Sequence, residues 1–257
     1  MEPVCNIPVL VGEGCASKIP QSCVLVKEEH DSPFCKKNTR VDVRLVATET
    51  AEYGHEGIRA TATQKEAQLR CFYTNAHSMG NKQEELEASV WWESYDMVTI
   101  TEMWWNESYS RSAVIDGYQL FKRDRKCRKG SGVALYVKKE CECMEINDDD
   151  DRVESLWVRI KAKANKSDIT VGVCYRPPNK EEEVDKTLYR QLGEVSRSLP
   201  LFLLGDFSFP DVCWIYNTAD REQSWAFLEC VGDNLLTQLV KEPARGSKIL
   251  DLLFVNR

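Results

Sequence analysis

Two short apolar segments, far apart in this chain, each end in a carboxylate. Residues 201–206 read Leu-Phe-Leu-Leu-Gly-Asp, and residues 97–102 read Met-Val-Thr-Ile-Thr-Glu. Apolar runs of this length are typical of strands that are covered on both faces. Placing a charged group at the end of such a strand costs desolvation free energy. The cost is compensated where a metal ion, a proton or a reacting group interacts with the charge. The pair therefore indicates either two capped turns or an α/β fold with a metal-dependent hydrolytic site.

Secondary-structure signals after residue 65 alternate between strands and helices. Alternating polarity predicts a half-buried strand over 156–162, and apolar runs predict further strands at 69–74, 97–101, 118–122, 132–137, 169–175, 201–206 and 249–255. Helices are expected from an N-cap at Asn81 through Ser94, over 181–199 and over 222–234. Several hairpins among these elements favour a four-layer α/β sandwich, two mixed sheets flanked by helices, over a doubly wound sheet.

Residues 1–65 differ from the rest of the chain. They contain four cysteines and no sustained helical or strand periodicity, so we expect an irregular leader with one short strand at Val41–Val46, followed by a single domain over 66–257. A metal-binding knuckle made by these cysteines and His30 is the alternative. The gaps between the cysteines are wider than usual for zinc ligands, which argues against it.

Composition narrows the function classes. The 257 residues carry a formal net charge of −7, so any nucleic-acid contact must come from a local basic patch. The 11 cysteines include no Cys-x-x-Cys pair, which argues against a zinc ribbon and a disulfide framework. No apolar stretch is long enough to span a bilayer, and no signal-peptide pattern begins the chain. We expect an intracellular protein, nuclear or cytoplasmic and not secreted.

Six short motifs occur in order from Leu69 onward. They are Tyr73-Thr-Asn-Ala-His-Ser-Met79, Thr101-Glu-Met-Trp-Trp105, Gly132-Val-Ala-Leu-Tyr136, Tyr175-Arg-Pro-Pro178, Gly205-Asp-Phe207 and Ile249-Leu-Asp-Leu-Leu253. In this order and spacing the chain resembles the endonuclease domain of LINE-type (non-LTR) retrotransposons of the chicken-repeat/jockey kind. That domain belongs to the endonuclease/exonuclease/phosphatase superfamily, and the resemblance implies its four-layer fold and metal-dependent DNA cleavage.

The resemblance also implies roles for individual residues. Glu102 matches the principal ligand of Mg²⁺ (or Mn²⁺), with Asn75 beside the metal as a further ligand and catalytic residue. Asp206 matches the group that orients or deprotonates the attacking water, and Tyr175 matches a tyrosine near the scissile phosphate. Asp251 matches the aspartate that orients a catalytic histidine, a pairing that sets which imidazole nitrogen faces the substrate.

The chain departs from the family pattern at two places. Ser208 stands where the family has a catalytic asparagine, and the loss of a positioned donor costs on the order of 2–4 kcal/mol in the barrier. The family continues past the position of Arg257 to a strand that carries the catalytic histidine, and none of His30, His55 and His77 matches it. We therefore expect a sandwich without its last strand and with an uncovered sheet edge. The alternative function is an inactive retroelement remnant or a DNA-binding protein.

A basic segment at 122–129 supplies the candidate DNA contacts. The cations proposed to touch phosphates are Arg123, Arg125, Lys126, Arg128, Lys129 and, from the Tyr-Arg-Pro-Pro motif, Arg176. A solvated turn is the alternative for the segment. DNA is the expected partner, with no membrane and no protein partner inferred.

Overall fold

The computed structural model describes most of the chain after residue 66 and two short segments before it. The described residues are 21–26, 41–47, 67–80, 82–104, 113–124, 132–146, 150, 152–162, 167–178, 181–240 and 248–256. For 21–26, 41–47, 67–68 and 124, only the backbone is described.

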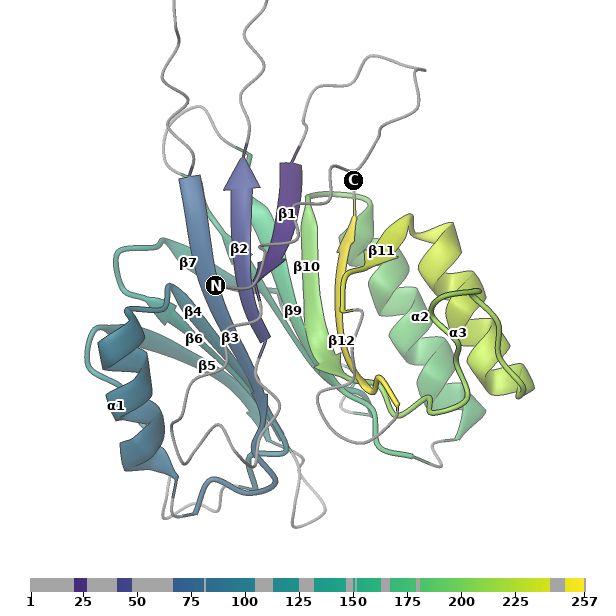
Figure 1. The fold of residues 1–257 in the computed structure, drawn as a ribbon, viewed down its shortest axis with the longest axis horizontal. Coiled ribbons are helices and arrows are strands. Elements are labelled where there is room, and N and C mark those ends of the chain that lie inside the picture. Colours follow the sequence, from purple (N-terminus) through teal and green to yellow (C-terminus); the bar gives the residue numbers. More distant parts are fainter. Residues whose placement is uncertain are drawn as a thin grey trace, which may run out of the picture.

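The described residues contain two six-stranded mixed sheets that face each other (Figure 1). The first sheet has the order β1 (Gln21–Val26), β2 (Val41–Ala47), β3 (Ala67–Asn75), β4 (Met97–Thr101), β6 (Gly132–Lys138) and β5 (Tyr118–Asp124). Its β3 and β4 are parallel and joined through a helix, as the sequence predicts. The other neighbouring pairs are antiparallel.

The second sheet contains the motif strands of the C-terminal half. Its order is β11 (Leu236–Gln238), β12 (Asp251–Asn256), β10 (Leu201–Asp206), β9 (Ile169–Tyr175), β8 (Glu154–Ile160) and β7 (Cys143–Ile146). Only β9 and β10 are parallel, because α2 (Glu182–Ser196) connects them.

Helices cover the outer faces of both sheets and complete the expected four layers. Figure 1 shows α1 (Gln83–Glu93) beside the first sheet, and α2 and α3 (Glu222–Asp233) beside the second. The expected N-cap of α1 is one residue too early: Lys82 occupies that position and makes no side-chain capping bond, and Asn81 lies outside the described residues.

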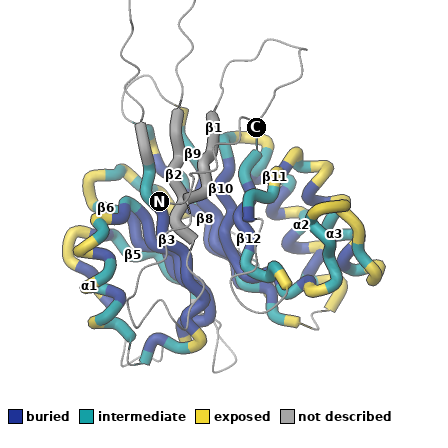
Figure 2. The backbone as a smooth tube through the Cα atoms, in the orientation of Figure 1, coloured by how far each residue is buried: buried dark blue, intermediate teal, exposed yellow. Residues whose placement is uncertain are grey.

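One apolar cluster lies between the sheets. It combines side chains of the inward-facing positions, such as Cys71 and Met97 of the first sheet with Val173 and Leu204 of the second. Two further clusters lie under α1 and under α2 with α3. Figure 2 shows this burial as continuous dark strands in both sheets. Every residue of β4 and β10 is buried, including the threonines of β4, because both faces of these strands are covered.

The leader contributes more regular structure than the sequence indicates. The strand expected at Val41–Val46 is present as β2, but Gln21–Val26, assigned to irregular chain, forms β1 and pairs with it. Because β2 pairs with β3, it extends the first sheet away from β4. No described helix is long and apolar enough to cross a membrane.

Candidate active site

Four polar side chains form one row across the second sheet. The strand register pairs Glu154 with Tyr175, Tyr175 with Asp206, and Asp206 with Asp251. Residues directly opposite one another on neighbouring strands point to the same face of a sheet. This face is the inward one, because Leu204, two residues before Asp206, belongs to the cluster between the sheets. The row therefore lies where the second sheet meets the first.

The first sheet presents Asn75 and Glu102 to this row. Asn75 ends β3, and Glu102 follows the last residue of the neighbouring β4. The Asn75 amide nitrogen Nδ2 donates to Glu102 Oε1 at 2.9 Å and to Asp206 Oδ2 at 3.1 Å. All three residues are less than 10% exposed. One buried amide thus bridges the two strand-end carboxylates that the sequence analysis singled out.

Two loops with unusual backbone conformation hold these groups. The backbone N–H groups of Ala76, Ser78 and Met79 each donate at 2.9 Å to carbonyls of residues 101–103. His77 and Glu102 have φ of 44° and 54°, in the left-handed region that costs an ordinary side chain roughly 1–2 kcal/mol. Such strain concentrates at functional sites, where the surrounding structure maintains it.

His77 contacts Glu102 from the solvent side. The distance from its Nδ1 to Glu102 Oε2 is 2.8 Å, and the side chains of His77 and Glu102 are 45% and 11% exposed. The sequence analysis gave His77 no role, because the resembled family has none at this position. The structure places this imidazole directly on the predicted metal ligand.

Asp251 contacts a tyrosine of the other sheet. The Tyr73 hydroxyl donates to Asp251 Oδ1 at 2.7 Å and lies 3.1 Å from Thr101 Oγ1. Burial, Asp251 and Asp206 raise the pKa of Tyr73 well above its ordinary value, so its hydroxyl stays protonated and acts as a donor. Asp251, which the resemblance pairs with a catalytic histidine, therefore accepts a hydrogen bond from the Tyr73 hydroxyl in this structure.

Asp206 is a carboxylate that favours protonation. Burial first, and then the charge of Asp251, raise its pKa to about 7, although hydrogen bonds from Ser208 oppose the shift. The backbone N–H and the Oγ of Ser208 lie 3.0 and 3.1 Å from Asp206 Oδ1. Ser208 therefore points into the site, and its hydroxyl is engaged with Asp206.

Tyr175 lies between two carboxylates of its row, Glu154 and Asp206, and also contacts Glu102. Burial, the charge of Glu102 and a hydrogen bond to it raise the pKa of Tyr175 well above its ordinary value, with smaller contributions from Asp206 and Glu154. The tyrosine is therefore a neutral hydrogen-bond donor in the physiological pH range.

The glycine before Asp206 is required by strand packing. A Cβ atom at Gly205 would lie 1.9 Å from the backbone oxygen of Cys174 on β9. Only glycine lets β10 approach β9 this closely, and that approach places Asp206 opposite Tyr175. The Gly-Asp dipeptide of the sequence motif thus has a packing reason as well as a chemical one.

Arg176, one of the residues predicted to contact DNA phosphates, is buried in the structure. Arg176 is 4% exposed, and its guanidinium makes two bonds to Asp185 of α2, at 2.7 and 2.9 Å, while it stacks over the Phe209 ring. This arrangement anchors the loop after β10 to α2. It leaves the guanidinium buried rather than at the surface, so we leave Arg176 out of the proposed DNA contacts.

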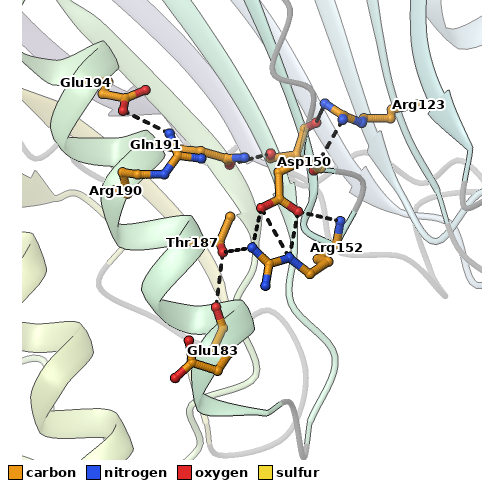
Figure 3. A network of polar contacts seen from close by, with 9 residues as sticks. Arg123, Asp150, Arg152, Glu183, Thr187, Arg190, Gln191 and Glu194 are labelled. Carbon is orange, nitrogen blue, oxygen red and sulfur yellow. Dashed lines mark hydrogen bonds and ion pairs between the residues drawn. The ribbon is translucent and has the colours of Figure 1, made fainter.

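Arg123 lies at the end of β5 and crosses to the second sheet. Its guanidinium nitrogens lie 3.3 and 3.4 Å from the carbonyls of Asp150 and Ser155, within the polar network drawn in Figure 3. Arg152 in the same network makes a two-nitrogen bond to Asp150 and reaches Thr187 of α2. The other predicted phosphate contacts, Arg125, Lys126, Arg128 and Lys129, lie outside the described residues.

The carboxylate and amide oxygens at this edge are suitable ligands for a hard divalent cation. Within the described part of the chain, no group of three or more His, Cys, Asp or Glu side chains is arranged to hold a metal ion. Magnesium, however, commonly uses one or two protein carboxylates and completes its shell with water and substrate oxygens. Glu102 provides such a carboxylate, and the shift in the pKa of Asp206 indicates negative charge that a cation would offset.

Comparisons with known proteins identify the fold. No protein-family model and no curated protein matches the sequence. The solved endonuclease domain of TRAS1, a telomere-specific non-LTR retrotransposon, aligns with a TM-score of 0.54 at 17% identity, over 72% of this chain and 83% of that domain. The chain has the fold of this endonuclease domain.

Other solved structures align at lower scores. An AP endonuclease from Archaeoglobus fulgidus covers 72% of this chain and 84% of its own, with 14% identity and a TM-score of 0.49. The mannosyl-6-phosphatase Bt3783 of Bacteroides thetaiotaomicron covers 69% of this chain and 77% of its own, with 14% identity and a TM-score of 0.48.

Sequence reasoning gave no role to three residues of this edge: Tyr73, His77 and Glu154. Tyr73 and Glu154 carry a signal that was available. Tyr73 is two residues before Asn75, and Glu154 is two residues before the alternating strand expected at 156–162, so period-two reasoning places both on inward faces. For His77, in a loop, no periodic signal exists.

Proposed function

We propose that this chain hydrolyses phosphodiesters with the help of a divalent metal ion and acts on DNA as an endonuclease derived from a non-LTR retrotransposon. The observation that carries the proposal is the bridge from Asn75 to both Glu102 and Asp206 at one edge of the sandwich. The fold of the TRAS1 endonuclease domain supports the same reading.

Each of these groups has a task in phosphodiester hydrolysis. Asp206, with a pKa of about 7, accepts a proton from the attacking water near neutral pH. Glu102, with Asn75 beside it, would hold Mg²⁺ or Mn²⁺, which neutralises charge on the phosphoryl oxygens. Tyr175 stays protonated and donates a hydrogen bond toward the phosphate. Tyr73 orients Asp251, whose charge keeps Asp206 basic.

The DNA contacts belong to the same proposal. Arg123 lies near the end of β5, and Arg125, Lys126, Arg128 and Lys129 come after it in the sequence; a local basic patch is what an acidic protein needs to bind a polyanion.

Nicking of supercoiled plasmid tests the proposal. We expect relaxed circles to form with Mg²⁺ and not with EDTA, and we expect Asp206→Ala and Glu102→Ala to lower the rate by at least about 100-fold. Glu194→Gln is the matched control, because this carboxylate is exposed on α2 and pairs with Arg190. Nicking that persists in Asp206→Ala would reject the assignment of the base.

A second candidate function, DNA binding without cleavage, is favoured by the hydrogen bond of Ser208. Its hydroxyl bonds Asp206, so this short side chain presents no amide donor toward a substrate. If this candidate holds, folded wild-type protein retains DNA in a gel-shift assay but leaves the plasmid intact. Ser208→Asn should then raise nicking, and asparagine tolerates the φ of 47° at this position.

A further inference from the structure

We propose that His77 is a positioning residue that holds the Glu102 carboxylate in the orientation needed to bind the divalent cation. This inference rests on the metal-dependent function proposed above. It adds a residue that the resembled family does not use, and it concerns binding of the cation itself.

Each oxygen of Glu102 has a donor from the end of β3 or from the loop that follows it, in addition to the hydrogen bond that Tyr175 makes to this carboxylate. Asn75 Nδ2 donates to Oε1 at 2.9 Å, and His77 Nδ1 lies 2.8 Å from Oε2. In the role proposed here Glu102 is an ionised ligand that can only accept, so the donor in this contact is the His77 Nδ1–H. The terminal torsion of a glutamate is otherwise broad, and one donor on each oxygen restricts it. Each oxygen keeps lone-pair capacity for a cation.

The backbone brings the two donors and the carboxylate together. The Ser78 N–H donates to the Glu102 carbonyl at 2.9 Å, so the loop of His77 and the loop of Glu102 are joined next to the side-chain contact. His77, Ser78 and Glu102 have φ of 44°, 92° and 54°. Left-handed backbone at these three residues costs conformational free energy. It brings the two joined loops together so that His77 contacts Glu102.

Exposure separates this role from a purely structural one. The His77 side chain is 45% exposed, and ion pairs with this much solvent contact contribute little to folding stability. Groups that orient a metal ligand, by contrast, change metal affinity roughly 10- to 100-fold when they are removed. Loss of His77 should therefore change cation affinity far more than the melting temperature.

Binding of Mn²⁺ alone to the full chain, followed by electron paramagnetic resonance near neutral pH, tests the inference. The informative pair is His77→Leu, which has no donor, and His77→Asn, which keeps a side-chain N–H and tolerates the left-handed backbone. Lys82→Ala is the control for a loosened loop, because Lys82 Nζ donates to the Ala76 carbonyl, a backbone group of that loop. Thermal melts without metal monitor folding of every variant.

We expect His77→Leu to weaken Mn²⁺ binding at least about 10-fold, with His77→Asn and Lys82→Ala within about threefold of wild type. Equal affinity in wild type and His77→Leu would overturn the inference and leave the proposed function standing. Equal losses in His77→Leu and Lys82→Ala would also overturn it, because loop order alone would then explain the effect. If His77→Leu does not fold, His77→Asn carries the test. A loss of Mn²⁺ affinity of about 10-fold in folded His77→Asn, which keeps the donor, would then overturn the inference. A wild-type chain that binds no Mn²⁺ would reject the metal-dependent function itself.

Discussion

The Tyr73 hydroxyl is a buried donor shared by residues of both sheets. It bonds Asp251 of β12 and lies beside Thr101 of β4, so it links the two sheets next to Asp206. A hydrogen bond to a charged group is worth about 1.5–3 kcal/mol, compared with about 0.5–1.5 for a neutral pair. The phenol therefore stabilises the fold and the charge of Asp251 together.

Tyr73→Phe should reduce the free energy of unfolding by about 2–3 kcal/mol, because the part-buried Asp251 carboxylate loses a hydrogen-bond donor. Tyr136→Phe is the matched control: its hydroxyl donates to the neutral Ala113 carbonyl at 2.6 Å, and we expect a loss of about 1 kcal/mol. Urea denaturation measures both. Equal losses in the two variants would show that the charge of Asp251 adds nothing to the Tyr73 bond.

At the scale of the elements, the closeness of β9 and β10 decides where the site residues lie. Gly205 allows β10 to lie against the Cys174 carbonyl, and Gly172 lies under the ring of Trp157, whose nearest atom is 2.3 Å from a Cβ built there. The parallel pairing that results sets Asp206 opposite Tyr175. The buried pair of Arg176 and Asp185 then fastens the loop after β9 to α2, and Arg176 also stacks over Phe209 of the loop after β10.

Gly205→Ala should destabilise the chain by about 3 kcal/mol or more, since the added methyl group meets backbone that cannot move without breaking the β9–β10 ladder. Gly193→Ala in α2 is the control. Its Cβ would be 3.6 Å from Asn234 Oδ1, an ordinary contact, and alanine favours a helix by about 1 kcal/mol. Thermal melts of the two variants should shift in opposite directions, and equal shifts would contradict the packing argument.

At the scale of the whole molecule, the sandwich brings carboxylates from two sheets to one edge. Glu102 comes from the first sheet, whereas Asp206 and Asp251 come from the second, and their charges add to the effect of burial on Asp206. Without a cation this arrangement opposes folding whenever all three groups are ionised. The fold therefore has a pH-dependent stability that originates at the edge where these carboxylates meet.

The sign of that dependence follows from the pKa of Asp206, which is about 7 in the folded chain and ordinarily 3.8. Between these values the folded state holds a proton that the unfolded state has released, so stability falls as pH rises from about 4 to about 7. Urea denaturation in EDTA at pH 5 and pH 8 should show a loss of a few kcal/mol at the higher pH. Asp206→Asn should remove most of this loss, and an unchanged pH dependence in that variant would assign it to other groups.

Local sequence patterns predicted the helices and strands. They also predicted where the strands that bear the candidate site residues end. The predicted strands at 97–101, 169–175 and 201–206 agree with β4, β9 and β10, because hydrophobic runs and turn residues act over a few neighbours. Together with the motif resemblance, they identified Asn75, Glu102, Tyr175, Asp206 and Asp251, which do lie at one edge.

The tertiary structure alone decided which of these residues touch. Tyr73 and Asp251 are 178 residues apart, and their contact depends on how two sheets pack face to face. His77 reaches Glu102 only because two loops join in left-handed conformations, and Arg176 is buried because Asp185 of α2 lies beside it. Contacts of this kind depend on the packing of whole layers, a property that no short window of sequence encodes.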